Sequence, residues 1–365
     1  MRFFVSLALA LFVALAAQAQ GSTTTDEDSG LTIRLRPIDE ASVRIVGVGG
    51  TRLVAFDGRS GSSRIVGIPD ARHGTGVVVG PGLIATARHV IESADFLAVI
   101  FPGETEPVAA RVLYVDPFHD VAILRVERET TTSVPVPERA PVLSLSQRLS
   151  ASGYPIEIRE RYPAAVSGEL SRQRNDGRLQ LAMSVNPGNS GGPVIDESGR
   201  LIGIVSARGD TSRGVEGIAI VEPARFVAVA LEAVADMAPR PWTEQERLLA
   251  RIVTALARVE NDRPSYEQTE LETIRRAAAE VTTGEAAMMV AALAWNMHIA
   301  LLEARRKRDV NQLSPEDRSS AEGLLEVARD LAGRARDRTP YLIRTYPIMR
   351  AITAASGQSW VPSRE

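Results

Sequence analysis

The sequence predicts an all-β region followed by an all-α helical bundle. From Ala41 to Val221, short runs of branched and aromatic residues alternate with turns rich in Gly, Pro and Asp. Many short strands with frequent turns are typical of barrels or sandwiches rather than of a parallel sheet. From Pro239 onward, apolar residues recur at helical spacing. With 365 residues, 44% of them hydrophobic, the chain is long enough for two domains with their own cores.

The start of the chain has the composition of a secretory signal at residues 1–19. Arg2 gives a positive start, Phe3–Ala16 is an apolar run, and Ala17–Ala19 forms an A-x-A cleavage site. A retained membrane anchor is the alternative, but about 14 apolar residues are short for a membrane span. We therefore expect cleavage after Ala19, export to the periplasm or secretion, and a flexible lead-in at residues 20–40.

The all-β region, residues 41–238, divides into two sets of strands at residues 41–126 and 141–222, closed by an amphipathic helix at residues 223–237. Between the sets, Glu127–Ala140 contains three threonines and two prolines and predicts a surface linker. The first set is expected to hold strands at Val43–Val48, Arg52–Phe56, Gly76–Val79, Leu83–Ala87, Phe96–Phe101, Val108–Val115 and Val121–Val126. The second is expected to hold strands at Pro141–Leu145, Ser150–Tyr154, Ala164–Leu170, Gln180–Val185, Gly192–Ile195, Leu201–Arg208 and Gly217–Val221.

Residues 239–365 are predicted to form a separate α-helical domain. Thr243 and Glu246 have the spacing of a capping box, and an apolar stripe follows them. Further helices are expected at Ser265–Val281 and Glu285–Arg308, and from Ser314 and Thr339 onward. This domain could bind a protein partner, cover a cleft or form an oligomer contact, and the sequence leaves these roles open.

Composition excludes several classes of function. The net charge of −3 gives no electrostatic case for nucleic-acid binding. The absence of cysteine excludes disulfides, thiolate metal sites and cysteine nucleophiles. We expect no metal and no cofactor.

The most informative stretch is Asn186–Pro193, in which three glycines surround Ser190. Glycines allow a backbone to turn tightly and to approach a ligand closely. The loop could therefore present the Ser190 hydroxyl and aim the N–H groups of Gly188 and Ser190 at one point. Acyl transfer needs this combination of a nucleophile and donors to a developing oxyanion. A Gly-rich hairpin loop without chemistry is the alternative.

A serine nucleophile needs a neighbouring base, and the chain has four histidines. His89 is the preferred base because it stands where an apolar strand ends. His73 is predicted to be solvated in a polar loop, and His119 to point away from the neighbouring Asp120. His298 falls within the third predicted helix of the bundle and fits a core position.

The base must be held in one tautomer by a carboxylate. Asp120 precedes the apolar run Val121–Leu124, which would bury it, and a buried carboxylate needs a partner. Asp116, before Pro117, is the competing candidate and is interpreted as a turn residue. Asp120 is therefore the preferred orienting acid.

Three motifs together resemble the trypsin/chymotrypsin superfamily, and specifically its HtrA-like bacterial branch. They are Thr86–Val90 around the histidine, Asp120–Leu124, and Gly188–Pro193 around the serine. The resemblance covers about Ala41–Met237. It implies an all-β chymotrypsin-like double β-barrel with the site between the barrels. It also implies a serine endopeptidase that acts on protein or peptide substrates.

The resemblance also assigns roles to the site residues. Ser190 is the nucleophile, His89 the general base and acid, and Asp120 the residue that orients His89. Gly188, Asn189 and Ser190 form the oxyanion hole, with the N–H groups of Gly188 and Ser190 as donors. Because Asn189 is neutral, where the digestive members carry an aspartate, we expect no activation by N-terminal clipping.

Substrate specificity is inferred by similarity alone. The expected pocket has an uncharged residue at its base, so preference for Arg or Lys is not expected. Its apolar walls favour small or medium aliphatic side chains before the scissile bond. The pocket residues are Ser184 at the base and Val205, Ser206, Ala207, Ile218 and Ile220 along the walls.

Two other functions compete with this interpretation. The same fold could serve as a non-catalytic binding or chaperone module. The pattern Gly188–Gly192 also satisfies the Gly-x-Ser-x-Gly signature of α/β-hydrolase esterases, although these require the order Ser, Asp, His. HtrA-like proteins typically continue into PDZ domains, but the helical pattern after Pro239 departs from that arrangement.

Overall fold

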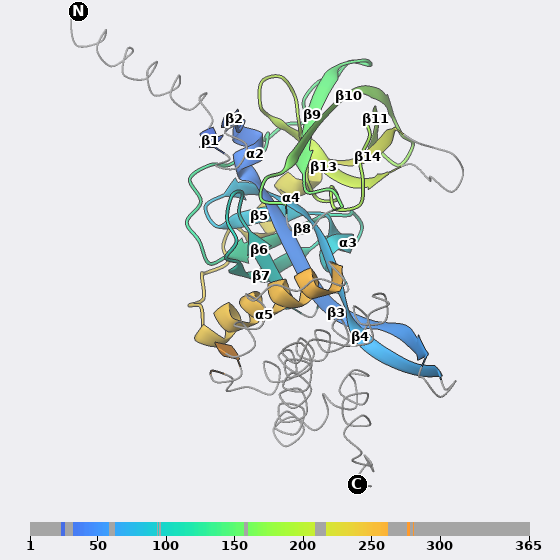
Figure 1. Ribbon diagram of the computed structural model, residues 1–365. Helices are drawn as coiled ribbons and strands as arrows, with labels where there is room; N and C mark the ends of the chain where they lie inside the picture. Colours follow the sequence, from blue (N-terminus) through green and yellow to red (C-terminus); the bar gives the residue numbers. More distant parts are fainter. Residues whose placement is uncertain are drawn as a thin grey trace, which may run out of the picture.

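Two closed barrels, each of six antiparallel strands, form the centre of the molecule (Figure 1). The structure is a computed structural model that describes residues 23–25, 32–57, 63–92, 94, 96–156, 160–208, 217–261, 276–277 and 280. The arrangement confirms the predicted chymotrypsin-like double barrel. It is incompatible with an α/β-hydrolase, because the strands of both barrels pair in antiparallel fashion.

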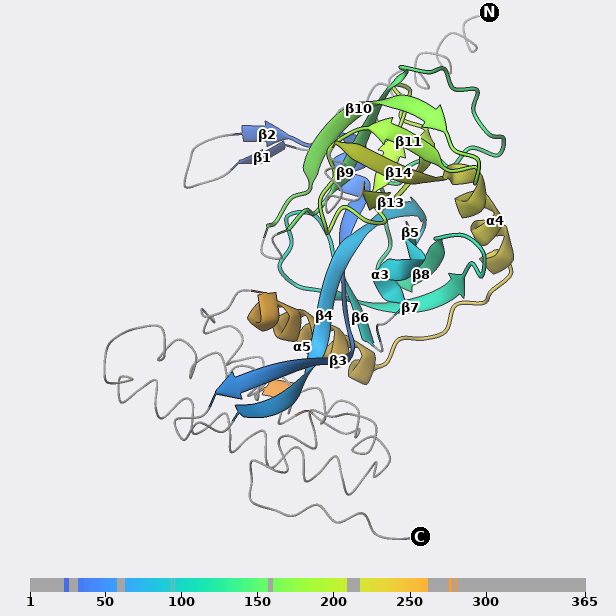
Figure 2. The same ribbon diagram turned by 90° about the vertical axis from the view of Figure 1, so that its right-hand side faces the viewer.

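The first barrel has the strand order β3-β4-β5-β8-β7-β6. Val43–Val48 and Arg52–Phe56, predicted as separate strands, belong to one long strand with a register shift between Gly49 and Arg52. With β4 it forms a hairpin whose tip extends beyond the barrel (Figures 1 and 2). The strands are β3 (Ser42–Asp57), β4 (Ser63–Gly80), β5 (Leu83–Thr86), β6 (Phe96–Ile100), β7 (Val108–Val115) and β8 (Ala122–Val126).

His73 is the residue whose predicted environment was wrong in this barrel. It lies in strand β4, where it pairs with Val46 of β3, and not in the solvated loop that was predicted. The polar sequence around it suggested a loop, but the backbone ladder of the long hairpin continues through Arg72 and His73 regardless of side-chain polarity.

The second barrel has the strand order β10-β11-β14-β13-β12-β9. The predicted strand Pro141–Leu145 is instead irregular. Its side chains do alternate, since Leu143 packs on the barrel core while Val142 is 96% exposed. Among the described residues, however, no strand pairs with this segment. The strands are β9 (Arg148–Gly153), β10 (Ala164–Gln173), β11 (Leu179–Ala182), β12 (Pro193–Ile195), β13 (Leu201–Arg208) and β14 (Ile218–Pro223).

Helix α4 (Ala224–Val234) joins the two barrels, within the range predicted for the closing helix. It follows β14 of the second barrel, yet Val227, Ala230 and Val234 are buried in the core cluster of the first barrel. Burying three apolar side chains in this way contributes several kcal/mol. The helix therefore fixes the two barrels, and any site between them, in one arrangement.

Part of the segment predicted to be a flexible lead-in is ordered. β1 (Thr23–Thr25) and β2 (Thr32–Arg34) form a two-stranded sheet, and helix α2 (Pro37–Ala41) follows. Ile38 and Ala41 are buried, and Asp39 accepts hydrogen bonds from Arg36. The apolar anchors explain the order. Residues 1–19 lie outside the described part of the chain.

Helix α5 (Glu244–Asn261) is the first helix of the region predicted to be a separate bundle. The expected capping box is present, since Glu246 accepts from Thr243 N at 2.9 Å and donates its own N–H to Thr243 Oγ1 at 3.2 Å. The helix packs directly against the first barrel (Figure 1). The later predicted helices lie almost entirely outside the described residues. No helix in the described part of the chain is long and apolar enough to cross a membrane.

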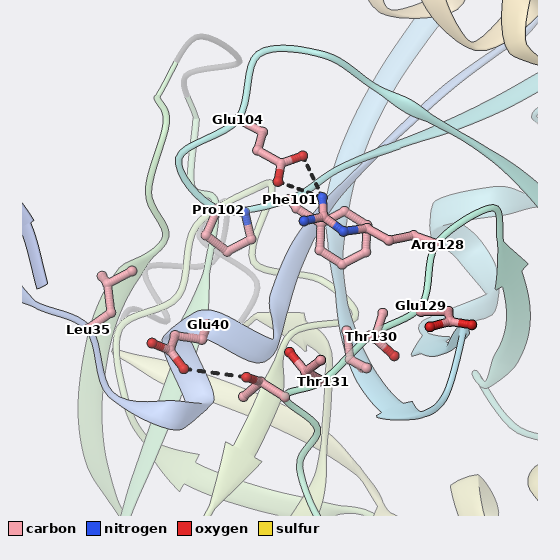
Figure 3. Close-up of a pocket in the computed structure, with 11 residues that line it drawn as sticks. Leu35, Glu40, Phe101, Pro102, Glu104, Arg128, Glu129, Thr130 and Thr131 are labelled. Carbon is pink, nitrogen blue, oxygen red and sulfur yellow. Dashed lines mark hydrogen bonds and ion pairs between the residues drawn. The ribbon is translucent and has the colours of Figure 1, made fainter. Parts of the chain in front are cut away.

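The linker between the barrels runs across the first barrel. Thr130 Oγ1 donates to Gly80 O and accepts from Gly82 N, both at 3.0 Å. Beside it, a hollow of about 170 Å³ is bounded by α2 and by Arg128, which pairs with Glu104 (Figure 3). None of the candidate site residues lines this hollow.

Candidate active site

The loop around Ser190 connects β11 to β12 and is closed by two turns. Asn189 N donates to Asn186 O and Gly192 N donates to Asn189 O, each at 3.0 Å. Gly188 and Gly191 have φ values of 99° and 83°, which side chains rarely tolerate. The glycines of this loop therefore have a backbone role, as the sequence suggested.

Space also requires glycine at two of these positions. A Cβ atom at Gly188 would stand 2.1 Å from Tyr154 O, and one at Gly191 would stand 2.1 Å from Thr75 O. Both neighbours are backbone atoms and cannot move without shifting a barrel. The tight approach brings the serine loop of the second barrel against the first barrel.

Thr75 of β4 is the residue that holds the loop there. Its N–H donates to Ser190 O at 2.8 Å, and its hydroxyl donates to Gly188 O at 2.7 Å. Thr86 Oγ1 in turn donates to Thr75 O at 2.7 Å. Sequence reasoning did not assign Thr75 a role. The only available signal was its position between two glycines, because its contacts are made across barrels.

His89 and Asp120 meet at the edge of the first barrel. His89 lies in the short helix α3 (Arg88–Ile91), directly after β5, and Asp120 lies in the turn before β8. Asp120 Oδ2 is 2.8 Å from His89 Nδ1, and Oδ1 accepts His89 N at 3.0 Å. The paired contact fixes both the position and the ring orientation of His89.

A third group, Ser206, completes the surroundings of Asp120. Its Oγ donates to Asp120 Oδ2 at 2.6 Å from β13 of the second barrel. Burial opposes ionisation of Asp120, but hydrogen bonds from His89 and Ser206 outweigh it and lower the pKa of the carboxyl. Asp120 is therefore ionised at neutral pH and accepts the Nδ1 proton of His89, leaving Nε2 free to act as a base.

The competing residues have other partners. Asp116 Oδ1 accepts N–H groups from Phe118 and His119, both at 2.8 Å, so it is the turn residue that the sequence suggested. The His119 ring stacks on Phe226 with centroids 3.5 Å apart. Neither residue takes the place of Asp120 or His89.

Ser190 belongs to the same region but makes no hydrogen bond with His89 among the described residues. Its carbonyl is bound to Thr75, whose neighbour Gly74 packs against Val90, the residue after His89. Strand β4 therefore contacts both the loop that carries Ser190 and the short helix that carries His89. Catalytic hydrogen bonds are often long before substrate binds and shorten in the complex.

The backbone donors of the loop differ in availability. The Asn189 N–H is used within the turn by Asn186 O. In the described part of the chain, the N–H groups of Gly188 and Ser190 have no acceptor. Of the three residues predicted to form an oxyanion hole, these two have N–H groups free to bind an oxygen.

The predicted pocket residues fall into two groups. Ser184, Ala207 and Ile218 are at least partly exposed. Val205 and Ile220 are buried, and the Ser206 hydroxyl faces Asp120 rather than a pocket. Only the first group presents side chains that substrate could contact without rearrangement.

Part of this chain is similar to known proteins. Residues 74–204 match the family model of a trypsin-like peptidase domain. The matched range contains His89, Asp120 and Ser190, and it begins at the strand segment that binds the serine loop.

Several curated proteins are similar to the peptidase domain. An uncharacterized protein, y4bJ, of Sinorhizobium fredii is 35% identical over 149 residues, which cover 38% of this chain and 22% of that protein. The chloroplastic Protease Do-like 1 of Arabidopsis thaliana is 33% identical over 151 residues, covering 39% and 34%. A probable periplasmic serine endoprotease, DegP-like, of Ectopseudomonas mendocina is 28% identical over 155 residues, covering 41% and 32%. The chain therefore spans about a third or less of these relatives' lengths.

Proposed function

We propose that the protein is a serine endopeptidase whose catalytic residues are Ser190, His89 and Asp120. The main support for this proposal is the pair of hydrogen bonds between His89 and Asp120. Ser206 of the other barrel donates a further hydrogen bond to Asp120. A partly buried carboxylate that fixes one imidazole tautomer is the arrangement that a serine nucleophile requires. The trypsin-like peptidase match over residues 74–204 supports the same reaction.

The proposed reaction proceeds by acyl transfer. Ser190 Oγ attacks the carbonyl carbon of the peptide bond while His89 Nε2 takes the hydroxyl proton. The N–H groups of Gly188 and Ser190 bind the negative oxygen of the tetrahedral intermediate. His89 then gives the proton to the leaving nitrogen, the C–N bond breaks, and a water activated by His89 hydrolyses the acyl-serine. Asp120 stabilises the imidazolium that forms in each step.

The proposed substrates are proteins or peptides with small or medium aliphatic residues before the scissile bond. Ser184 and Ile218 offer no charge to recognise an arginine or lysine side chain. Names of related proteins, such as the Do-like protease and the DegP-like endoprotease, support a protein substrate. A cleavage profile dominated by arginine would contradict this part of the proposal.

The proposed setting is outside the cytoplasm. Residues 1–19 would act as a cleaved signal, residues 41–238 as the protease, and residues 239–365 as a helical domain. The apolar start of the chain and its similarity to a probable periplasmic serine endoprotease support export. N-terminal sequencing of the mature protein tests it, with Gln20 as the expected first residue.

Covalent labelling tests the catalytic proposal directly. A fluorophosphonate is expected to add one adduct to wild-type protein, located at Ser190 by mass spectrometry of its peptides. Ser190→Ala should lose the adduct and hydrolysis while keeping the thermal unfolding temperature, and Ser144→Ala, at an exposed serine, should retain both. Labelling of Ser190→Ala at the wild-type rate would refute the assignment.

The missing Ser190–His89 hydrogen bond favours one other function, a non-catalytic binding module. In that case the wild-type protein would bind unfolded protein but remain unlabelled by the fluorophosphonate. The labelling experiment therefore separates the two functions in one step.

A further inference from the structure

His73 is a half-buried polar side chain that the proposed reaction does not use. It lies in β4 two residues before Thr75, so the two side chains leave the strand on the same face. Its Nε2 atom is buried and has no hydrogen-bond partner in the described part of the chain. A buried nitrogen without a partner is rare in folded proteins and calls for an explanation.

His73 contacts the loop that carries the proposed oxyanion hole. Its Nε2 lies 2.9 Å from the point where a Cβ atom of Gly188 would stand. Thr75, from the same strand face, donates its hydroxyl to Gly188 O at 2.7 Å. β4 therefore meets Gly188 at two points, one a hydrogen bond and the other a packed ring.

The surroundings keep this ring uncharged. The charged and titratable groups that face it are Arg44 of β3 and Tyr154, which follows β9. The Arg44 guanidinium lies 4.5 Å from the centre of the Tyr154 ring and donates to Glu160 O at 2.6 Å. Burial and the Arg44 charge lower the pKa of His73 to about 4, and they outweigh a backbone hydrogen bond with Tyr154 that acts in the opposite direction. At neutral pH the ring is therefore uncharged and occupies the space beside Gly188.

We propose that His73 is a positioning residue for the oxyanion hole. By packing beside Gly188, its ring sets the direction of the Gly188 N–H. This inference rests on the proposed peptidase function. Gly188 has no Cβ atom, so its two flanking peptide planes can rotate unless neighbours restrain them. Thr75 restrains the plane that contains Gly188 O, and His73 occupies the space into which Gly188 itself would move.

The expected effect is confined to the transition state. Loss of one complete oxyanion donor costs about 10²–10³-fold in kcat. Misdirection of the donor should cost less, about 10–50-fold, because a hydrogen bond weakens steeply only when its N–H···O angle falls below about 120°. Binding of the ground-state substrate should not change, since His73 does not lie among the pocket residues.

The test compares His73→Gln, His73→Asn and His73→Ala in the full chain. Gln is neutral and reaches nearly as far as the imidazole, Asn is shorter, and Ala leaves the space empty. Each variant is assayed with an internally quenched peptide that has valine before the scissile bond. Two inhibitors are compared, a peptidyl valine boronate, which fills the oxyanion hole, and the same peptide with a reduced CH₂–NH bond, which cannot.

We expect kcat and boronate affinity to fall together in the order Gln, Asn, Ala, with KM and affinity for the reduced-bond peptide unchanged. Val142→Ala, at a side chain that is 96% exposed, serves as the control and should leave all four quantities at wild-type values. Thermal unfolding identifies any variant that fails to fold. If Ala does not fold, the Gln and Asn variants still give the graded comparison.

Two results would overturn the inference. One is a folded His73→Asn or His73→Ala protein with wild-type kcat and boronate affinity. The other is an equal loss of affinity for both inhibitors, which would show a general packing role. Failure of wild-type protein to bind the boronate would instead refute the proposed peptidase function, so the two failures are distinguishable.

Discussion

The two barrels build their halves of the site by different physical means. In the first barrel, His89 is held by side-chain polarity, through two hydrogen bonds with the carboxylate of Asp120. In the second, Ser190 lies in a loop whose glycines at positive φ fit closely against Thr75 and Tyr154, and Thr75 donates two hydrogen bonds to this loop. The histidine half should therefore respond to changes of charge, and the serine half to changes of volume.

Removing the charge in the histidine half gives the largest expected effect. Asp120→Asn keeps the shape but favours the wrong imidazole tautomer, and kcat should fall about 10⁴-fold with little change in KM. Steady-state kinetics on the quenched peptide measures it. Asp176→Asn, which removes an exposed carboxylate that pairs with Arg178, is the matched control and should be silent. A near wild-type kcat for Asp120→Asn would mean that the charge of Asp120 is not needed to position His89.

Adding volume in the serine half comes next. Gly191→Ala places a Cβ 2.1 Å from Thr75 O at φ 83°, so we expect a loss of about 4 kcal/mol or more in the free energy of unfolding. Gly199→Ala is the control, because its φ of 81° is similar but nothing lies within 4 Å of the new Cβ. It should cost only about 1 kcal/mol. Equal losses in urea unfolding would show that conformational strain, and not space, requires glycine at 191.

The contact between the halves predicts a pH effect on stability. His73 has its pKa lowered from 6.5 to about 4 on folding, so the unfolded chain binds more protons between these values. Stability from this group is complete above pH 6.5 and is lost as pH falls toward 4. At pH 5 the loss is about 2 kcal/mol. Urea unfolding at pH 7 and pH 5 should show His73→Gln losing less stability than wild type, and equal losses would contradict the burial argument.

The smallest expected effect lies outside both halves, where α5 meets the first barrel. Arg111 pairs with Glu246 at 2.6 Å, stacks on Trp242, and donates to the carbonyls of Arg240 and Pro241. Arg111→Ala should cost about 1 kcal/mol in the free energy of unfolding and leave kcat unchanged. Arg128→Ala, which breaks a more exposed pair with Glu104, should cost less. A change in kcat for Arg111→Ala would mean that α5 influences the site.

The sequence was sufficient for the parts of the site that depend on local patterns. The conformation of three segments could be predicted from their own residues. These segments are the strand before His89, the apolar run after Asp120 and the glycine-rich loop around Ser190. Ser206 and His73 could not be interpreted in the same way, because their partners lie in the other barrel. The sequence predicted that Ser206 lines a pocket wall and that His73 is solvated. In the structure Ser206 donates a hydrogen bond to Asp120 of the other barrel, and His73 packs beside Gly188 of the other barrel.

Two errors in the fold have the same origin. Residues 141–145 alternate as a strand does, but Val142 faces solvent and no neighbouring strand pairs with the segment. Helix α5 was predicted to begin a separate bundle, yet it packs on the first barrel and is bound there by Glu246 and Arg247. Periodicity indicates which face of a segment is apolar, and it does not indicate what covers that face.

The most direct test of the account is a crystal structure of the full chain with the peptidyl valine boronate. We predict a covalent bond from boron to Ser190 Oγ, with His89 Nε2 within about 3.2 Å of a boronate oxygen or of Ser190 Oγ. The second boronate oxygen should lie about 2.7–3.1 Å from the N–H nitrogens of Gly188 and Ser190. A boronate bound elsewhere, or His89 still out of contact with the adduct, would contradict the claim that the two barrels form one catalytic site.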